Sequence, residues 1–392
     1  MKGKIVQSVI IVLAFVSCMT SKNEVKFEKD GSFYIYSIVN DSIKGRFIFD
    51  TGADGLYLDS IFINNHISII KSALDTARMR GAGATGYKQV LLIKDTIKVK
   101  VGNYSHNFTN SPILKLTDIN GENIAGIIGN EFIKNQAIVF DNNRLTLKID
   151  SVVKYAEYES IISFDYVDGR IYFNVDIEIR ENEIITARLL MDLGCSDAII
   201  LNSPYFKSLT EKGILPEKVI DYTILYAGAL GGNSNGGDFR SISIKLGDYK
   251  INNPIISFSK DTLGSFSKTN YDGLLGNEIL DRYNYTIDYK NQKLYLIKNS
   301  KSKKNFNSTL SGFYALKRRE NAIVMSIYYQ SEAYKNGLQL GDTIIAINNK
   351  KLDNLTDKKF YEELKDEGKT IKLTILRNQK HMDITFKLKY LL

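Results

Sequence analysis

Two short motifs occur twice along the 392-residue chain, in the same order and at nearly the same spacing. The stretch Phe47–Ala53 (FIFDTGA) matches Leu189–Cys195 (LLMDLGC) at an offset of 142 residues. Further along, Gly126–Glu131 (GIIGNE) matches Gly273–Glu278 (GLLGNE) at an offset of 147 residues. Because both motifs keep their order and spacing, the chain is expected to contain a duplicated unit of about 130–140 residues.

Each copy of the unit has the sequence pattern of an all-β domain, and we expect the copies at residues 25–155 and 156–300. Runs rich in Ile, Val, Phe and Tyr alternate with Asn, Asp and Gly, which is typical of strands joined by turns. Helix is expected only briefly, around Ser60–Ala73. The predicted fold is mainly β, with two pseudo-symmetric β-lobes followed by a small α+β domain. The predicted strands include Phe33–Val39, Gly45–Phe49, Val90–Val101 and Ile171–Ile179.

The first motif ends an apolar strand with an aspartate in each half, Asp50 and Asp192. A lone Asp-x-Gly of this kind is most often ordinary turn chemistry. If the halves pack about a pseudo-two-fold axis, however, the two carboxylates meet. They then share one proton, because two carboxylates in contact do not both ionise easily. The ionised carboxylate would activate a water, and the protonated carboxyl would polarise a peptide carbonyl and then protonate the leaving amine.

A glycine-rich stretch lies between the two motifs in each half, at residues 80–87 (RGAGATGY) and 226–232 (YAGALGG). Glycines permit a mobile hairpin tip. A mobile hairpin above the two aspartates would exclude water and hold the substrate backbone. The residues predicted to form these two flaps are Gly83, Gly86, Tyr87, Tyr226 and Gly228.

This combination resembles the retropepsin-like aspartic protease family, in which a hydrophobic residue precedes Asp-Thr-Gly-Ala and a glycine-rich flap precedes two hydrophobic residues and a glycine. The resemblance covers residues 25–300 and implies an aspartic endopeptidase that cleaves polypeptides with Asp50 and Asp192 and needs no cofactor or metal. Since one chain holds both lobes, a monomer is expected. The active-site loops that the resemblance implies are Thr51, Gly52, Ala53, Leu193, Gly194 and Cys195.

The second copy departs from the family pattern at Leu193, which replaces the Thr or Ser that normally follows the aspartate. In the family that hydroxyl braces the two loops against each other. The alternative is therefore a catalytically weak or inactive protein of the same fold that binds peptides. Contact between the carboxyls of Asp50 and Asp192 would favour catalysis, whereas a Leu193 wedged between the lobes would favour the inactive alternative.

The C-terminal part, residues 308–392, does not belong to the repeat and follows a polar linker at Lys301–Asn305. Its Ser-x-Ala, Gly-Leu and Gly-Asp elements between Ser331 and Asp342 resemble a PDZ domain of the type associated with bacterial proteases. In that family a loop before the first strand holds a terminal carboxylate with its N–H groups, and the peptide ligand adds as a strand. The alternative is a domain used only for packing. The loop that the resemblance implies is Ser311, Gly312 and Phe313.

The N-terminus has the pattern of an export signal, with Lys2 and Lys4 before a short apolar run, Ile5–Val16. That run is too short to span a bilayer. It ends at a sequence, FVSC, that resembles the lipobox of bacterial lipoproteins. The resemblance implies a lipoprotein signal at residues 1–18, cleaved so that Cys18 becomes the lipidated first residue of the mature protein. It also implies a protein anchored by lipid in the cell envelope, periplasmic or surface-facing. The alternative is a plain secretory signal.

Several other functions are disfavoured by the sequence. The net charge is +8, but the Lys and Arg residues are scattered, which argues against nucleic-acid binding. The three His residues are far apart and no HExxH motif occurs, which argues against a metal site. Gly81–Gly86 fits GxGxxG, but no βαβ pattern surrounds it. Cys195 aligns with Ala53 of the first copy, so we expect a small buried residue beside the aspartates and not a nucleophile.

Overall fold

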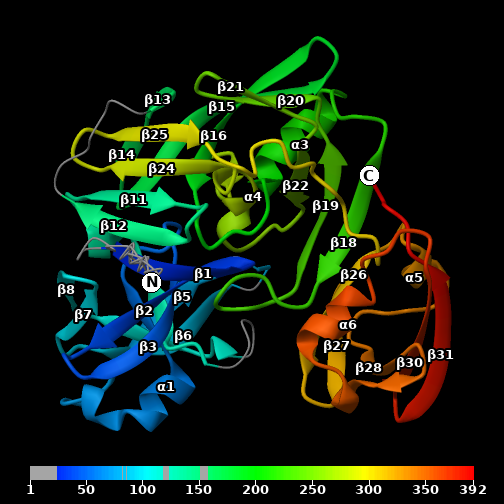
Figure 1. The fold of residues 1–392 in the computed structure, drawn as a ribbon, viewed down its shortest axis with the longest axis horizontal. Helices are drawn as coiled ribbons and strands as arrows, with labels where there is room; N and C mark the ends of the chain where they lie inside the picture. The colour runs from blue at the N-terminus through cyan, green and yellow to red at the C-terminus, as the bar shows by residue number, and fades with distance from the viewer. Residues whose placement is uncertain (1–23, 82, 85, 118–122, 151–157) are drawn as a thin grey trace, which may run out of the picture.

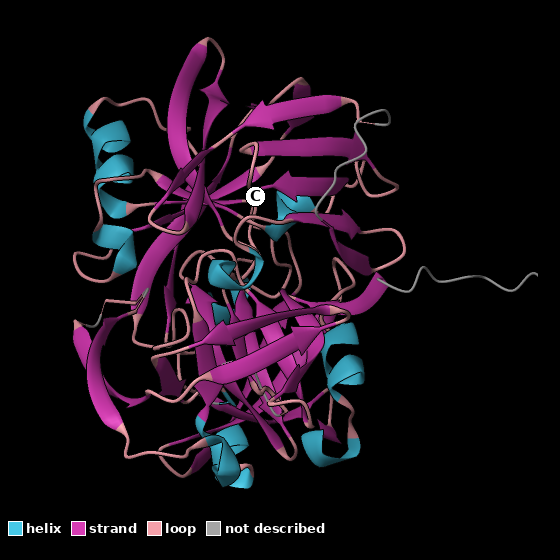
Figure 2. Ribbon diagram, turned by 90° about the vertical axis from the view of Figure 1, so that its left-hand side faces the viewer, coloured by secondary structure: helices cyan, strands magenta, loops and turns pink. Residues whose placement is uncertain are grey.

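The computed structural model describes residues 24–81, 83–84, 86–117, 123–150 and 158–392. Strands make up 49% of the structure and helices 12%, which confirms the prediction of a mainly β protein. The strands form two large sheets, and the few helices are short (Figure 1, Figure 2).

The N-terminal segment that carries the predicted export signal and Cys18 lies outside the described residues. Within the part of the chain that the structure describes, no helix is both long enough and apolar enough to cross a membrane.

The first lobe consists mainly of short strands. In chain order it contains β1 (Glu24–Asp30), β2 (Ser32–Val39), β3 (Ile43–Phe49), β4 (Leu56–Asp59), α1 (Ser60–Asn65), η1 (Ile67–Ile69), β5 (Asp75–Arg80), β6 (Tyr87–Ile93), β7 (Ile97–Val101), β8 (Tyr104–Phe108), β9 (Ser111–Leu114), β10 (Gly126–Ile128), η2 (Asn130–Ile133), β11 (Ala137–Asp141) and β12 (Thr146–Asp150).

The second lobe repeats this plan. It contains β13 (Ser160–Ser163), β14 (Asp165–Val167), β15 (Arg170–Arg180), β16 (Glu183–Met191), β17 (Ile199–Leu201), α3 (Ser203–Glu211), β18 (Val219–Ile224), β19 (Ser234–Arg240), β20 (Ser243–Leu246), β21 (Tyr249–Asn252), β22 (Ile255–Ser259), η4 (Ser265–Ser267), β23 (Gly273–Leu275), α4 (Asn277–Leu280), β24 (Tyr283–Asp288) and β25 (Lys293–Lys298).

Two local predictions in the first lobe need correction. The single strand predicted at Val90–Val101 is wrong, because the chain turns between β6 and β7. The carboxylate of Asp95 in this turn accepts the N–H groups of Lys71 and Ser72 at 2.8 and 2.9 Å, which fixes the break. The helix expected around Ser60–Ala73 is limited to α1 and the single 3₁₀ turn η1.

The repeated glycine motif forms the central strand of each lobe. β10 lies between β3, to which it is parallel, and β4, to which it is antiparallel. β23 lies in the same way between β16 and β17. A Cβ atom at Gly126 or Gly273 would come within 2.1 or 2.2 Å of a carbonyl oxygen of the neighbouring strand. The close three-strand contact therefore requires glycine, which explains why both copies of the motif begin with it.

The two lobes share one sheet and one hydrophobic core. β11 of the first lobe pairs antiparallel with β24 of the second, so the strand order β13-β25-β24-β11-β12-β1 crosses the lobe boundary. Phe140 and Tyr285 stack across this pair with ring centroids 4.6 Å apart, and both are buried. This shared sheet holds the halves in a fixed relation about the pseudo-two-fold axis.

The C-terminal domain has a hydrophobic core of its own, which includes Phe313, Val324 and Phe360. In Figure 1 it lies beside β18 and β19 of the second lobe. Its strand β27 pairs antiparallel with β18, so its sheet is continuous with that of the second lobe. The elements of the domain are β26 (Phe313–Arg318), β27 (Asn321–Tyr328), α5 (Glu332–Lys335), β28 (Thr343–Ile347), β29 (Lys350–Lys351), η5 (Leu352–Asn354), α6 (Asp357–Glu362), β30 (Thr370–Arg377) and β31 (Lys380–Lys387).

Candidate active site

Asp50 and Asp192 meet at the boundary between the lobes. Asp50 follows β3, and its N–H group donates to the carbonyl of Ile128 at 3.0 Å. Asp192 follows β16, and its N–H group donates to the carbonyl of Leu275, also at 3.0 Å. The two carboxyl groups interact directly with each other. The register of the repeat thus brings together two side chains that lie 142 positions apart in the sequence.

Glycines two residues after each aspartate give the carboxyl groups room to meet. The N–H of Gly52 donates to Oδ1 of Asp50 at 2.7 Å, and the N–H of Gly194 donates to Oδ1 of Asp192 at 2.8 Å. A Cβ atom at Gly52 would lie 2.7 Å from Cγ of Asp192, and one at Gly194 would lie 2.7 Å from Cγ of Asp50. Any larger residue at either position would push the opposite carboxyl away.

Thr51 braces the two loops with one buried hydroxyl. Its Oγ1 donates to the carbonyl of Met191 at 2.8 Å and accepts the N–H of Leu193 at 3.0 Å. Leu193 has no hydroxyl to return this contact, but its side chain is fully buried in the hydrophobic core. It does not separate the carboxyl groups, which remain in contact.

One asparagine holds the far side of each aspartate loop, and this role was not predicted from the sequence. Nδ2 of Asn130 donates to the carbonyl of Thr51 at 2.5 Å, and Nδ2 of Asn277 donates to the carbonyl of Leu193 at 2.7 Å. The hydroxyl of Tyr289 donates to Oδ1 of Asn130 at 2.6 Å. The signal was present in the sequence, because both copies of the glycine motif continue with Asn-Glu.

The surroundings of the pair favour the protonated state. Burial raises the pKa of Asp50 above its usual value. Burial, followed by the nearby charge of Asp50, raises the pKa of Asp192 well above its usual range. The pair therefore keeps a shared proton at pH values where isolated aspartates are ionised. Burial, followed by the nearby charges of Asp197, Asp192 and Asp50, raises the pKa of the Cys195 thiol, which is the wrong direction for a nucleophile.

The aspartates line a cavity of about 530 Å³. Its walls repeat the symmetry of the lobes, since Ile48 and Leu190 precede the aspartates and Ile127 and Leu274 come from the central strands. The second lobe adds an aromatic wall. The aromatic residues of that wall near the aspartates are Tyr172, Phe266 and Tyr271. The cavity therefore combines a polar floor with apolar sides, as expected for a site that binds small molecules or peptide side chains.

The second glycine-rich hairpin lines this cavity, and the tips of the two hairpins touch. The N–H of Ala84 donates to the carbonyl of Asn233 at 2.9 Å, and Nζ of Lys88 donates to the carbonyl of Leu230 at 2.6 Å. A Cβ atom at Gly83 would lie 2.7 Å from the carbonyl oxygen of Gly232. The first hairpin is β5–β6 and the second is β18–β19, so each lobe contributes one.

The predicted flap residues do not all face the cavity. Tyr226 and Gly228 line it, as does Ala229. Gly83 lies at the contact between the tips, while a Cβ atom at Gly86 would meet open space. Tyr87 begins β6 of the first hairpin, is 62% exposed and does not line the cavity. Its ring lies under the guanidinium group of Arg78 on the neighbouring strand.

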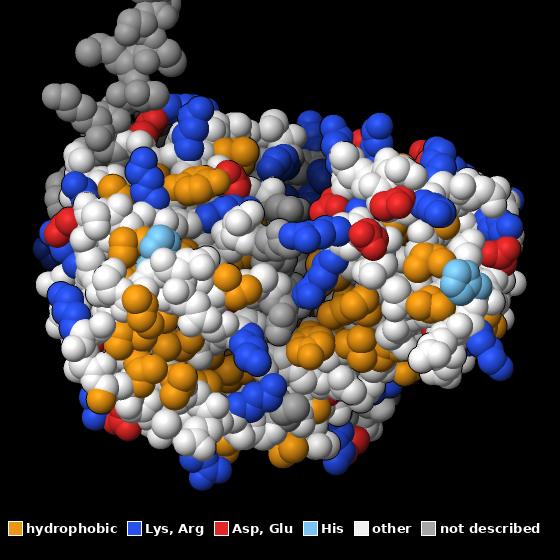
Figure 3. Space-filling view, turned by 90° about the horizontal axis from the view of Figure 1, so that it is seen from below, with side chains coloured by type: hydrophobic (Ala, Val, Ile, Leu, Met, Phe, Trp, Pro, Cys, Tyr) orange, Lys and Arg blue, Asp and Glu red, His pale blue; other side chains and the backbone are white. Residues whose placement is uncertain are grey.

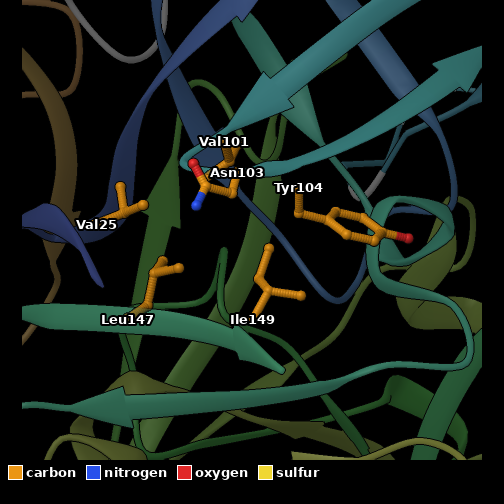
Figure 4. Close-up of a pocket in the computed structure, with 6 residues that line it drawn as sticks. All are labelled: Val25, Val101, Asn103, Tyr104, Leu147 and Ile149. Atoms are coloured by element: carbon orange, nitrogen blue, oxygen red, sulfur yellow. The ribbon is translucent and has the colours of Figure 1, made fainter. Parts of the chain in front are cut away.

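A second, smaller cavity of about 140 Å³ lies in the first lobe and contains no ionisable pair (Figure 4). It is lined by Val25, Val101, Asn103, Tyr104, Leu147 and Ile149. Among the described residues, no group of three or more His, Cys, Asp and Glu side chains is arranged to hold a metal ion.

The predicted peptide loop of the C-terminal domain precedes β26. β26 pairs with β27, and its other edge faces α6, where the hydroxyl of Tyr361 donates to the carbonyl of Ala315 at 3.1 Å. In the loop, the N–H of Gly312 donates to Oγ1 of Thr309 at 3.3 Å, and Oγ of Ser311 donates to the carbonyl of Phe313 at 2.8 Å. In the resemblance to PDZ domains, this edge of β26 is the one to which a peptide adds as a strand. Here the ring of Tyr361 also stacks on that of Tyr314 beside the edge.

A family model described as a PDZ domain matches residues 297–388. The C-terminal part of the chain is therefore a PDZ domain, as predicted, and PDZ domains bind peptides. Comparison with curated proteins finds no significant match to the chain.

Proposed function

We propose that this protein is an aspartic endopeptidase with two retropepsin-like lobes, in which Asp50 and Asp192 hydrolyse peptide bonds. The observation that carries the proposal is the direct interaction of the two carboxyl groups, each packed against the glycine of the opposite loop, on the floor of the 530 Å³ cavity. Two carboxyl groups in contact, with one shared proton, are the arrangement that activates water without a metal or a covalent intermediate.

In the proposed reaction the ionised and the protonated carboxyl groups of the pair have different roles. The ionised oxygen takes a proton from a water placed between the pair and the scissile carbonyl, and the protonated carboxyl donates to that carbonyl oxygen. Collapse of the tetrahedral intermediate then needs a proton on the leaving amine, which the pair returns. Thr51, Asn130 and Asn277 do not touch substrate in this scheme. They are positioning residues that hold the two aspartate loops together.

The cavity also supports an extended polypeptide as the substrate. Contacting hairpin tips above the aspartates leave a cleft that runs between the lobes, and its apolar and aromatic walls suit large hydrophobic side chains. The proposal includes a place in the cell envelope, reached through the export signal and a lipid on Cys18. Metabolic labelling with a palmitate analogue, lost in Cys18→Ser, tests that part separately.

The decisive experiment compares cleavage of an unfolded polypeptide by the wild type, Asp50→Asn and Asp192→Asn at acidic pH. Each substitution removes one carboxyl and keeps its size, so each is expected to reduce kcat by at least about 10³-fold. Asp95→Asn, which changes an exposed aspartate of the first lobe, is the matched control and keeps full activity. Cleavage that survives Asp50→Asn would disprove the mechanism.

A peptide-binding protein without catalysis is the second candidate. The PDZ domain supplies a binding function by itself, and Leu193 removes one of the two hydroxyls that brace the family's loops. If the wild type binds unfolded peptides but never cleaves them between pH 3 and pH 8, this candidate replaces the first.

A further inference from the structure

We propose that the PDZ domain forms one wall of the substrate cleft, where it creates a subsite for a large apolar side chain of the polypeptide. The subsite lies between hairpin strand β18 of the second lobe and strands β26 and β27 of the PDZ domain. The proposal rests on the proposed function for the identity of its ligand. It adds a binding site that neither the aspartates nor the peptide groove of the PDZ domain supplies.

The backbone fixes the PDZ domain against the hairpin that covers the aspartates. Tyr222 to Ile224 of β18 pair antiparallel with Tyr328 to Ser326 of β27. Two further hydrogen bonds extend the pairing at its ends. The N–H of Leu225 donates to the carbonyl of Met325 at 2.8 Å, and the N–H of Tyr329 donates to the carbonyl of Asp221 at 3.0 Å. These bonds hold the PDZ domain at one side of the cleft.

Side chains reinforce the same contact. The hydroxyl of Tyr328 donates to the buried carboxyl of Asp238 on β19 at 2.6 Å. The rings of Tyr222 and Tyr328 pack edge to face with centroids 5.2 Å apart. The N–H of Asp221 donates to Oε1 of Gln330 at 3.0 Å. Hydrogen bonds, one of them to a buried group, and an aromatic contact together make a specific interface.

A cavity of about 340 Å³ lies between these elements, and it adjoins the aspartate cavity. Its PDZ wall is apolar and includes Tyr314, Leu316 and Met325. The two cavities have five lining residues in common, which come from the second aspartate loop and the β18 hairpin. These shared residues are Ser196, Asp197, Tyr222, Ile224 and Tyr226. A polypeptide bound over the aspartates therefore lies next to the PDZ wall.

The proposed subsite binds a side chain of the substrate and does not pair with the substrate backbone. β18 pairs with β19 on one edge and, over Tyr222–Ile224, with β27 on the other, so a substrate strand has no free edge of β18 to extend there. What remains open is aromatic surface, since Tyr226 is 47% exposed and Tyr314 is 49% exposed. Hydrophobic side chains also gather where the PDZ domain meets the body of the molecule (Figure 3). Covering such surface favours Leu, Met or Phe in the substrate.

The test uses a library of unstructured peptides with one randomised position, and it compares Leu316→Glu with a matched control. Leu316→Glu places a carboxylate in the apolar wall, whereas Met382→Glu makes the same kind of change on exposed β31 of the same domain. We expect Leu316→Glu to reduce kcat/KM about tenfold for library members with Leu, Met or Phe at one position on one side of the cleaved bond. Met382→Glu leaves the preference unchanged. An unchanged preference in Leu316→Glu overturns the proposal.

Binding separates this proposal from the proposed function. The Asp50→Asn protein holds the subsite but lacks the catalytic pair, so fluorescence anisotropy with the labelled library measures the subsite even if no protein cleaves. Weaker binding of Leu-, Met- or Phe-containing members after adding Leu316→Glu, but not Met382→Glu, supports the subsite. Equal binding by both, or no binding by the Asp50→Asn protein, overturns it. Leu316→Ala, with a smaller loss in the same direction, replaces Leu316→Glu if circular dichroism shows that the latter is unfolded.

Discussion

Thr51 is the residue through which the two aspartate loops contact each other most directly. Thr51→Ala removes the hydroxyl that joins the carbonyl of Met191 to the N–H of Leu193 and leaves both groups buried without that partner. We expect the free energy of unfolding to fall by about 1–3 kcal/mol and the cleavage rate to fall with it. Denaturant unfolding and a peptide cleavage assay measure the two effects. Thr51→Ser keeps the hydroxyl and should recover most of both, and a Thr51→Ala protein as stable and active as wild type would contradict the bracing role.

The aspartate pair should cost stability at neutral pH. Because burial raises the pKa of both carboxyls, their favourable neutral form is fully populated below about pH 4 and is lost as the pH rises through the raised values. Asp192→Asn keeps acceptor and donor atoms but removes the charge. We expect it to be more stable than wild type at pH 7, by about 1.4 kcal/mol for each unit of pKa shift, and to differ little at pH 3.

Asp95→Asn is the matched control for this stability measurement, and we expect it to change the stability at pH 7 in the opposite direction. Backbone N–H groups of Lys71 and Ser72 lower the pKa of exposed Asp95, so its ionised form is the stabilising one above its usual pKa. Asp95→Asn should therefore be less stable than wild type at pH 7 and equal to it at low pH. Chemical denaturation of both variants at pH 3 and pH 7 provides the comparison. An Asp192→Asn protein that is less stable than wild type at pH 7 would show that the charge of the aspartate pair does not destabilise the folded protein.

Residue-level prediction from the sequence succeeded where the repeat constrains it and failed where it does not. The alignment of the two copies placed Asp50 opposite Asp192, because the same strand and turn recur in each lobe. It did not assign Asn130 and Asn277, whose role depends on which carbonyls their amides reach. The sequence also did not predict that the side chain of Tyr87 faces solvent. The conformation of the glycine-rich tip decides which face of the hairpin turns outward, and glycine permits several backbone conformations.

At the scale of elements, the contact between the two hairpin tips joins one lobe to the other. A Cβ atom at Gly83 would collide with the carbonyl of Gly232, whereas one at Gly86 meets nothing within 4 Å. Gly83→Ala should therefore hold the tips apart and reduce kcat/KM by about 10- to 100-fold. Gly86→Ala, on the same tip, should leave it unchanged. Steady-state kinetics with one peptide substrate measure both, and equal activities would mean that the tips need not meet during turnover.

The sequence predicted both hairpins from their glycines, but not that they bond to each other. The bonds from Ala84 to Asn233 and from Lys88 to Leu230 use backbone carbonyls, which every residue has. The same limit applies to β18 and β27, whose pairing uses backbone groups of segments about 100 positions apart. The local composition of a segment can predict that it forms a strand. Which other strand it pairs with depends on how the whole chain packs.

For the whole molecule, the buried contact between Asp238 and Tyr328 makes docking of the PDZ domain sensitive to pH. Burial raises the pKa of Asp238 from 3.8 to about 7. The titratable groups that face it are Asp197, Tyr222 and Tyr328. Undocking removes Tyr328 from Asp238 and returns the carboxyl towards water, where its pKa is lower. The docked form therefore binds the extra proton between about pH 4 and pH 7, and docking weakens as the pH rises through about 7.

Hydrogen–deuterium exchange of the amides in β18 and β27, corrected for intrinsic rates, measures this docking. We expect stronger protection at pH 5 than at pH 8 in the wild type, with a slope of at most about 1.4 kcal/mol per pH unit. Asp238→Asn has no carboxyl to titrate and should lose that pH dependence. Tyr328→Phe removes the hydrogen bond that stabilises the ionised form, so its protection should fall most at pH 8. A pH dependence that persists in Asp238→Asn would assign the effect to another buried carboxyl nearby, such as Asp197, whose pKa is also raised by burial. Under the proposed function, the acidic conditions that favour the protonated aspartate pair are then also those that hold the PDZ domain against the second lobe.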